Sequence, residues 1–194
     1  DLQVEHLSAY PLMYEEGTPL FRMLKQGRVQ EINDELSLDM YNLLVDRLTG
    51  AGYEHYEISN FARPGFRSKH NSSYWHDIPY IGLGAAAHSY SGTERSWNCA
   101  DLQAYIQAIE SGLRPCEVEQ IDASTHYNDI ITTALRTREG IDIGNLPCNQ
   151  RKYLLQSASK YLNEGLLCYE QGRLHLTRQG IYLSDTIMSD LMWV

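Results

Sequence analysis

The chain has 194 residues, of which 43% are hydrophobic and 21% charged, as in an ordinary globular protein. Its 16 basic and 25 acidic side chains give a formal net charge of −9, which disfavours nucleic acid or an anionic membrane as a partner. No run of about 20 apolar residues and no signal-peptide pattern occurs, so we expect a cytoplasmic protein without an integral membrane segment.

Four cysteines are spread along the chain, at Cys99, Cys116, Cys148 and Cys168. They form no CxxC or CxxxCxxC motif, so a thiolate-held zinc or iron–sulfur site is not expected within this chain. We expect all four to be thiols that are buried or half-buried. The chain begins at Asp1, without a methionine and just before a predicted strand, which we interpret as a piece cut from a longer protein.

The first sixty residues predict a strand–helix–strand unit. Alternating apolar residues over 4–10 predict a strand that ends at Pro11. Apolar residues at helical spacing over 41–48 predict a helix, with Ser37 as its N-cap. A second strand is predicted over 53–58, and a connection of this length is typical of two parallel strands joined by a right-handed crossover.

The middle of the chain has a different pattern. Residues 59–79 lack periodicity but carry four aromatic side chains, which favours an ordered, functional segment over disorder. The small and apolar residues 80–90 predict buried sheet, in which glycine permits close packing. A short strand is predicted over 95–98.

The remainder is predicted to be mainly helical, and from about residue 115 the pattern resembles a winged-helix module. A DNA-binding function is disfavoured, because residues 125–194 carry seven basic and seven acidic side chains and no basic stripe. The predicted elements are helices over 102–109, 127–135 and 149–162, the last capped by Asn149, a hairpin over 166–177, and a final helix that begins at Thr177 and ends near Leu191.

The densest chemistry lies in the segment HNSSYWH at residues 70–76. A neutral imidazole such as that of His70 can ligate a metal or a haem iron, and neighbouring aromatic rings can stack on a flat macrocycle. The alternative is a loop in which Tyr74 and Trp75 pack on the core and both histidines lie in solvent. A zinc pair from His70 and His76 is disfavoured, because no second pair of ligands lies nearby in the sequence.

Residues 82–87 match the dinucleotide-binding pattern G-x-G-x-x-A. That fingerprint requires a helix to begin there, whereas the residues that follow favour strand and turn. The other interpretation is close packing of the sheet beside a ligand cavity. His88 then either projects into that cavity or is a core histidine with satisfied hydrogen bonds.

Arg63, Arg67 and Lys69 form a small basic cluster in an acidic protein. Such a cluster can receive carboxylates, phosphates or haem propionates, or it can balance local acids. Glu15 and Glu16 can form an acid–base pair, but adjacent carboxylates in a turn are usually only solvated.

Several strings resemble one family when they are taken in order. They resemble the second half of the oxygen-independent coproporphyrinogen III oxidase-like radical SAM proteins, and the segment LTRQG at 176–180 resembles that family's C-terminal domain. The strings are EHLSAY at 5–10, EEGTPL at 15–20, YEISNFARPG at 56–65, HNSSYW at 70–75 and YIGLGAAAHS at 80–89.

The resemblance implies an α/β (α+β) fold with two domains. Residues 1–114 are expected to hold the last strands of a partial (β/α) radical SAM barrel, its sheet extension and the loop with the haem motif. Residues 115–194 are expected to form a small winged-helix-like domain. The family's [4Fe–4S] cluster and S-adenosylmethionine would belong to the full-length protein only, because the CxxxCxxC half is absent. A barrel cut open exposes sheet edges and an apolar face, so either self-association or marginal stability is expected.

The HNxxYW string resembles the haem chaperone branch, the HemW-like proteins, which bind haem and pass it to acceptor proteins. This implies haem or a porphyrin as ligand and a haem-acceptor protein as partner. The alternative is an oxygen-independent coproporphyrinogen III oxidase that decarboxylates propionates by S-adenosylmethionine radical chemistry. Because radical generation requires the absent cluster, enzyme activity stays open and no catalytic residue is assigned.

The resemblance implies roles for two groups of residues. His70, Asn71, Tyr74 and Trp75 are expected to bind haem, with His70 as the axial ligand of the iron, and Tyr10, Gly84, Ala87 and His88 are expected to line a cofactor cavity. The basic residues Arg63, Arg67 and Lys69, singled out above by their charge, are candidate partners of propionates or other anions.

Overall fold

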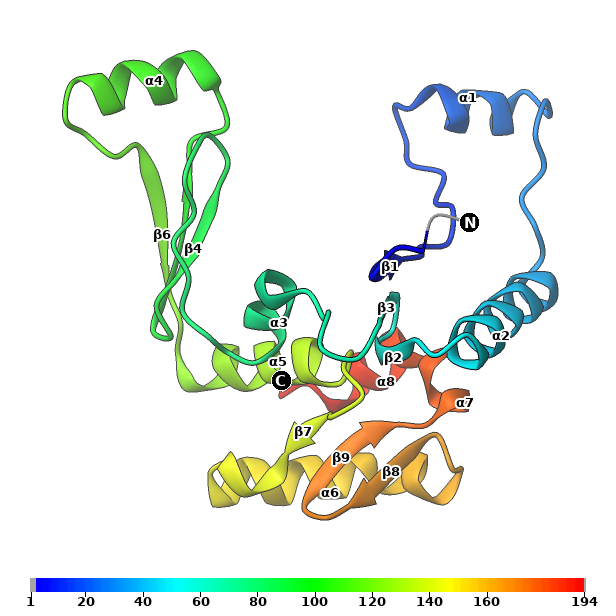
Figure 1. Ribbon diagram of the computed structural model, residues 1–194. Coiled ribbons are helices and arrows are strands. Elements are labelled where there is room, and N and C mark those ends of the chain that lie inside the picture. Colours follow the sequence, from blue (N-terminus) through cyan, green and yellow to red (C-terminus); the bar gives the residue numbers. More distant parts are fainter. Residues whose placement is uncertain (1–2, 194) are drawn as a thin grey trace. The chain divides into compact units, whose positions relative to one another are not determined.

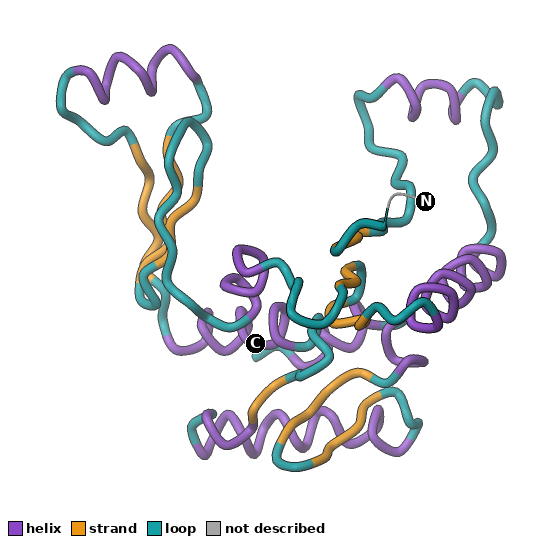
Figure 2. The backbone as a smooth tube through the Cα atoms, in the orientation of Figure 1, coloured by secondary structure: helices purple, strands orange, loops and turns teal. Residues whose placement is uncertain are grey.

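The computed structural model describes residues 3–193 and has two compact units, Asp1–Arg67 and Ser68–Val194. Figures 1 and 2 show the elements of each unit. The predicted cut at Asp1 lies outside the described residues. The predicted domain boundary at residue 114 falls inside the second unit and stays a prediction. Among the helices described, none combines the length and the apolar character that crossing a membrane requires.

The first unit is a three-stranded antiparallel sheet with two helices. Its core includes Val45 of α2, Tyr56 of β2 and Phe61 of β3, all less than 10% exposed. Its elements are β1 (His6–Ser8), α1 (Pro19–Lys25), α2 (Asp34–Gly50), β2 (Glu54–Glu57) and β3 (Asn60–Ala62), with the strand order β1-β3-β2.

The predicted direct pairing of the strands near 4–10 and 53–58 is wrong. The chain turns at Ser59 and inserts β3 between β1 and β2, antiparallel to both. The buried carboxylate of Glu57 holds this turn, because it accepts hydrogen bonds from the Ser59 amide at 2.9 Å and from Asn60 Nδ2 at 2.5 Å. The Ser8 hydroxyl donates to Asn60 Oδ1 at 2.6 Å, and this bond connects the turn to β1.

Helix α2 begins four residues earlier than predicted. Asn33, not Ser37, is the N-cap, and its side chain accepts a hydrogen bond from the Leu36 amide at 2.8 Å. Asparagine is as good an N-cap as serine, and Asp34 and Glu35 then place negative charge at the positive end of the helix dipole. The apolar periodicity located the middle of the helix and not its start.

The second unit contains two further antiparallel sheets, of order β4-β5-β6 and β7-β9-β8. Helix α4 connects β5 to β6 and lies at one end of their sheet (Figure 1). The elements are α3 (Lys69–Trp75), β4 (His88–Tyr90), β5 (Glu94–Asn98), α4 (Leu102–Glu110), β6 (Cys116–Gln120), α5 (Ala123–Ala134), β7 (Ile141–Asp142), a 3-10 turn (Ile143–Asn145), α6 (Cys148–Asn163), β8 (Leu167–Glu170), β9 (Arg173–Leu176), α7 (Arg178–Ile181) and α8 (Ser184–Leu191).

The core of this unit lies among α5, α6, α8 and the β7-β9-β8 sheet. Tyr127, Leu154, Leu174 and Leu191 are each fully or almost fully buried there. The hydroxyl of Tyr127 would be costly to bury alone, and it donates to the Leu191 carbonyl at 3.0 Å. The arrangement of helices and a small sheet is observed, whereas its assignment as a winged helix, and that of the first unit as part of a barrel, stay predictions.

Two predictions for the middle segment are wrong. Residues 69–75 form helix α3 rather than an irregular loop, since the Ser68 hydroxyl accepts from the Asn71 amide and starts the helix. Of residues 80–90 only His88–Tyr90 form a strand, β4, and the segment is not buried, for Ile81 is 83% exposed and Leu83 is 87% exposed. The chain closes a loop there, with Tyr80 paired to Tyr90, and Ile81 and Leu83 face solvent.

Three local predictions for the C-terminal region also need correction. Asn149 lies inside α6, which begins at Cys148 after Pro147 with no side-chain cap. The final helix is two helices, α7 and α8, because the backbone of Leu183 leaves the helical conformation. Cys148 is exposed, whereas the other three cysteines are half-buried as predicted. The predicted hairpin and the cap at Thr177, whose side chain accepts from the Gly180 amide at 3.1 Å, are confirmed.

Gly180 gives a test of this packing. A Cβ atom at position 180 would collide with the Leu166 carbonyl, which already accepts the Thr177 amide at 3.0 Å. We expect Gly180→Ala to lower the free energy of unfolding by about 2 kcal/mol, because neither backbone can move without breaking this bond. Denaturant unfolding followed by tryptophan fluorescence measures the change. The exposed neighbour is the control: Gln179→Ala should change stability by less than about 0.5 kcal/mol, and equal effects of both would contradict the packing described.

Candidate functional site

Helix α3 carries the predicted haem-binding residues on a single short element. The spacing of four residues brings His70 and Tyr74 onto one face, where His70 Nε2 and the Tyr74 hydroxyl are 2.7 Å apart. Their rings meet edge to face, with centroids 4.9 Å apart. Both side chains are exposed, and α3 has no buried residue. The structure therefore places His70 at the surface, beside a phenol that contacts its ring nitrogen.

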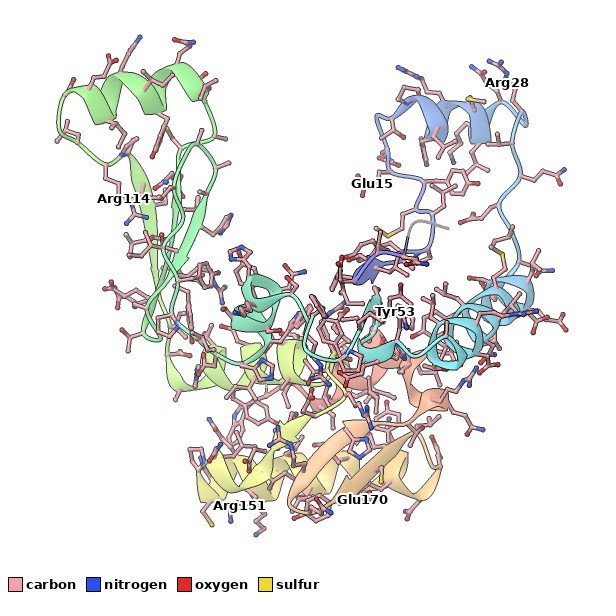
Figure 3. The ribbon with its side chains drawn as sticks, viewed as in Figure 1. Glu15, Arg28, Tyr53, Arg114, Arg151 and Glu170 are labelled. Atoms are coloured by element: carbon pink, nitrogen blue, oxygen red, sulfur yellow. The ribbon has the colours of Figure 1, made fainter. Side chains whose placement is uncertain are left out.

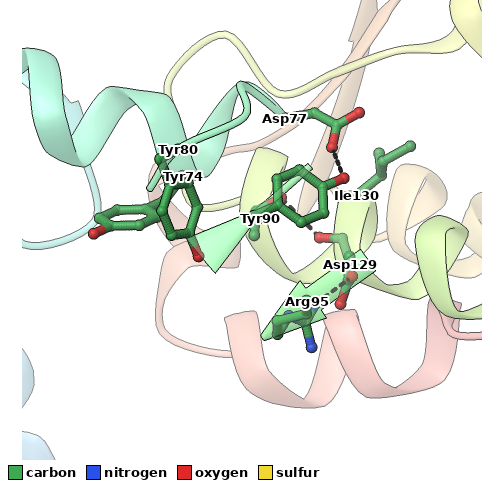
Figure 4. Close-up of a pocket in the computed structure, with 8 residues that line it drawn as sticks. Tyr74, Asp77, Tyr80, Tyr90, Arg95, Asp129 and Ile130 are labelled. Atoms are coloured by element: carbon green, nitrogen blue, oxygen red, sulfur yellow. Dashed lines mark hydrogen bonds and ion pairs between the residues drawn. The ribbon is translucent and has the colours of Figure 1, made fainter. Parts of the chain in front are cut away.

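A small pocket lined by three tyrosines lies next to α3 (Figure 4). Tyr74 contacts Tyr80 edge to face at 4.6 Å between centroids, and Tyr80 lies 6.0 Å from Tyr90. The cavity has a volume of about 170 Å³, well below the roughly 300–1,000 Å³ of pockets that enclose drug-sized ligands. Its lining comprises Tyr74, Asp77, Tyr80, Tyr90, Arg95, Asp129, Ile130 and Thr133.

The carboxylate of Asp77 connects two sides of this pocket. It accepts a hydrogen bond from the Tyr90 hydroxyl of β4 and lies 2.8 Å from Nε2 of His126 on α5. Burial, with the bond to Asp77 as the second cause, raises the pKa of Tyr90 well above its ordinary value. Burial also raises the pKa of Tyr80. Both shifts favour the neutral, hydrogen-bonding form of Tyr80 and Tyr90.

An ion pair forms the floor of the pocket. Arg95 of β5 donates to Asp129 of α5 at 2.5 Å and to Glu119 of β6 at 3.4 Å. Both Arg95 and Asp129 are about 30% exposed. Burial raises the pKa of Asp129, and the Arg95 charge acts in the opposite direction. The guanidinium is thus committed to two carboxylates of the same unit.

The other predicted cavity residues of this unit lie along the 80–90 loop and β4. His88 is exposed and stacks on Trp97 with ring centroids 6.0 Å apart, so it is not a core histidine. Gly84 has φ +108° and its carbonyl accepts from Asn98 Nδ2 at 2.8 Å, while the Ala87 carbonyl accepts from the Asn98 amide. No helix begins within residues 82–87, so the structural requirement of the dinucleotide fingerprint is not met.

The remaining predicted residues divide between the two units. Tyr10 in the first unit is 68% exposed. Arg63 donates to the Ala51 carbonyl at 2.6 Å and stacks over the Tyr53 ring, and Arg67 pairs with Glu54 at 2.9 Å. Lys69 is exposed on α3. Of the predicted basic cluster, only Lys69 thus belongs to the helix that carries His70.

Several pocket residues were missed by the sequence analysis. Tyr80 and Tyr90 were assigned to buried sheet, and Arg95 and Asp129 were not singled out, nor was His126, which contacts Asp77. The spacing of Tyr74, Tyr80 and Tyr90 around a proline- and glycine-containing loop was the available signal. Asp129 could have been noticed as a carboxylate beside the apolar residues of a predicted helix, where a partner is required.

Comparisons with known proteins agree with one another. Residues 121–183 match the model of the HemN C-terminal domain. The chain is 33% identical over 190 residues to heme chaperone HemW of Mycobacterium tuberculosis, covering 97% of this chain and 48% of that protein. It is 43% identical over 206 residues to radical S-adenosyl methionine domain-containing protein 1, mitochondrial, of Mus musculus, covering 97% and 46%.

A solved structure gives the same assignment at the level of the fold. Coproporphyrinogen III oxidase (HemN) from Escherichia coli, a radical SAM enzyme, matches with a TM-score of 0.68 and 15% sequence identity, over 97% of this chain and 48% of that chain. At this identity the likeness concerns the fold alone. The chain spans about half the length of the curated relatives it matches.

The burial of Tyr90 and its bond to Asp77 predict that this phenol titrates at an unusually alkaline pH. A raised pKa means that the neutral phenol stabilises the folded chain; this contribution is complete below about pH 10 and is lost as the pH rises through the higher folded value. The phenolate absorbance of wild type minus that of Tyr90→Phe isolates this residue. The difference should develop above pH 10, and Asp77→Asn should move it to lower pH. The hydrogen bond would be contradicted if the absorbance difference develops near pH 10 and is unchanged by Asp77→Asn.

Proposed function

This chain belongs to the HemN/HemW-like family of radical SAM proteins, and we propose that it is the part of a haem chaperone that holds haem through His70 and releases it to an acceptor protein. The observation that carries the proposal is the exposed imidazole of His70 on α3, with Tyr74 in contact with it. Asn71 and Trp75, on the same helix, complete the group.

The residues of α3 suit haem as cargo. An imidazole nitrogen is a good axial ligand for haem iron, and the neighbouring rings of Tyr74 and Tyr80 offer aromatic surface to a flat macrocycle. Lys69, exposed on the same helix, can meet a propionate. The roles of Arg63 and Arg67 toward propionates, and of Tyr10, Gly84, Ala87 and His88 as cavity lining, stay predictions.

The size of the tyrosine pocket favours transfer over storage. A cavity of about 170 Å³ does not enclose a macrocycle, so haem would lie on the surface of this unit. A carrier that gives up its cargo needs a ligand that an acceptor can reach, and an exposed histidine fulfils that condition. The acceptor is proposed only as a haem-binding protein.

The iron–sulfur cluster and S-adenosylmethionine implied by the family find no ligand set here. Cys99, Cys116, Cys148 and Cys168 form no CxxxCxxC motif, and the groups of metal-ligating residues among residues 3–193 include no cluster of cysteines. We therefore derive no radical step for this chain. Both groups are proposed for the full-length protein only.

Haem titration of His70 variants tests the proposal. We expect wild type to bind ferric haem with a shifted Soret band, and His70→Ala to bind at least tenfold more weakly, because the iron loses its axial nitrogen. His76→Ala is the matched control: His76 lies at the end of the same helix, with Nδ1 bonded to the Ser72 carbonyl, and should bind haem as wild type does. Identical titrations of wild type and His70→Ala would exclude His70 as the ligand.

Tyr74 distinguishes two kinds of axial ligation. The Tyr74 hydroxyl is hydrogen-bonded to His70 Nε2. If iron binds to this nitrogen, the hydrogen bond must break, which costs a net free energy of about 0.5–1.5 kcal/mol. Tyr74→Phe should therefore tighten haem binding about 2- to 10-fold if His70 is the ligand. Weaker binding, with loss of a phenolate-to-iron charge-transfer band, would instead make Tyr74 the ligand.

A further inference from the structure

The β8–β9 hairpin brings together three side chains that no function above uses. Cys168 and His175 are directly opposite one another in the antiparallel register, and Glu170 follows Cys168 by two residues on the same strand. Residues two apart on a strand share a face, and so do residues that oppose one another. Cys168, Glu170 and His175 therefore lie on one face, opposite to the face that buries Leu167 and Leu174.

The donor atoms of these residues are close enough to share an ion. One potential ligand atom of each lies within 4.8 Å of the other two. In a tetrahedral zinc site, with metal–ligand distances of about 2.0–2.3 Å, donor atoms lie roughly 3.3–3.7 Å apart. Side-chain rotations that bring the donor atoms about 1 Å closer together are enough to reach these distances, and they require no movement of the hairpin backbone.

The histidine has its metal-binding nitrogen available. His175 Nδ1 lies 3.2 Å from the Leu176 carbonyl, which can only accept, so Nδ1 carries the proton and Nε2 holds the lone pair. Metal-bound histidines commonly use this arrangement, in which the second nitrogen donates to a carbonyl and orients the ring. Gly140 lies beside His175, and a side chain at position 140 would collide with it.

The charges of the site suit a divalent cation. Glu170 is exposed and lies two residues from Cys168 on the same strand. Arg173 is the register partner of Glu170, but its described bonds go to the carbonyls of Glu139 and Gly140 and to Asp142. One thiolate and one carboxylate neutralise a charge of +2.

We propose that Cys168, Glu170 and His175 form a three-ligand site for Zn²⁺ on the outer face of the β8–β9 hairpin. A thiolate, an imidazole and a carboxylate are the donor types that zinc takes, and the soft sulfur disfavours magnesium and calcium. Glu170 is exposed on the hairpin (Figure 3). The fourth coordination position of the zinc ion is therefore open to water or to a ligand from another molecule. The site is independent of haem binding by His70.

Cobalt and zinc titrations test this site in the haem-free chain, with any affinity tag removed. We expect one Co²⁺ per chain, with a thiolate-to-cobalt charge-transfer band that Zn²⁺ displaces. Cys168→Ser should abolish the band, and Glu170→Gln and His175→Gln should each weaken Zn²⁺ binding at least tenfold, measured by competition with a chromophoric chelator. Cys148→Ser is the control, because Cys148 is exposed, and should behave as wild type.

A second measurement needs no variant and so does not depend on variant folding. Zn²⁺ should slow alkylation of Cys168 at least tenfold in the native chain while alkylation of Cys148 stays unchanged, as mass spectrometry of the labelled peptides would show. The proposal is overturned if the wild-type chain binds no Co²⁺, if the charge-transfer band persists in Cys168→Ser, or if Zn²⁺ protects both cysteines alike.

Discussion

The ion pair between Arg95 and Asp129 is the contact on which the candidate site depends. It joins β5 to α5 and closes the floor of the tyrosine pocket. Burial alone disfavours the charged form of Asp129, and Arg95 is the group that offsets this cost. A half-buried carboxylate is less stable without its guanidinium, so this ion pair stabilises the contact between β5 and α5 beside the pocket. The second carboxylate on Arg95, from Glu119, extends the same constraint to β6.

Helix α5 contacts both the C-terminal core and this pocket. Tyr127 and Ile131, four residues apart, are fully buried in the C-terminal core. His126 and Asp129, three apart, contact the pocket from the same helix. Helix α3 is different: a helix of seven residues without a buried side chain is marginal by itself and depends on its neighbours. The proposed haem ligand, His70, therefore lies on an exposed short helix beside a helix that is anchored in the core.

Sequence reasoning succeeded where one signal determined the local structure. The hairpin turn at Gly172, the strand Glu94–Asn98 and the helix Leu102–Glu110 were all predictable from turn residues and periodicity. Sequence reasoning failed where a contact between residues from different elements determines the local structure. The insertion of β3 follows a turn held by Glu57, and no sequence signal indicated that this charged residue would be buried. The exposed loop with Ile81 and Leu83 has the composition of buried sheet, and its closure through Tyr80 and Tyr90 is a contact between residues ten apart.

The haem site at His70 and the zinc site at Cys168 differ in how far the sequence alone could predict them. His70 and Tyr74 could be paired from the sequence, because four residues make one turn of a helix wherever that helix lies. Cys168 and His175 could not be recognised by cysteine spacing, since motifs such as CxxC describe ligands that are close along the chain. A hairpin brings residues seven apart face to face, and its register, not the interval in sequence, decides which side chains share a site. A chain whose four cysteines are too far apart for such a motif can therefore still bring one thiolate together with a carboxylate and an imidazole.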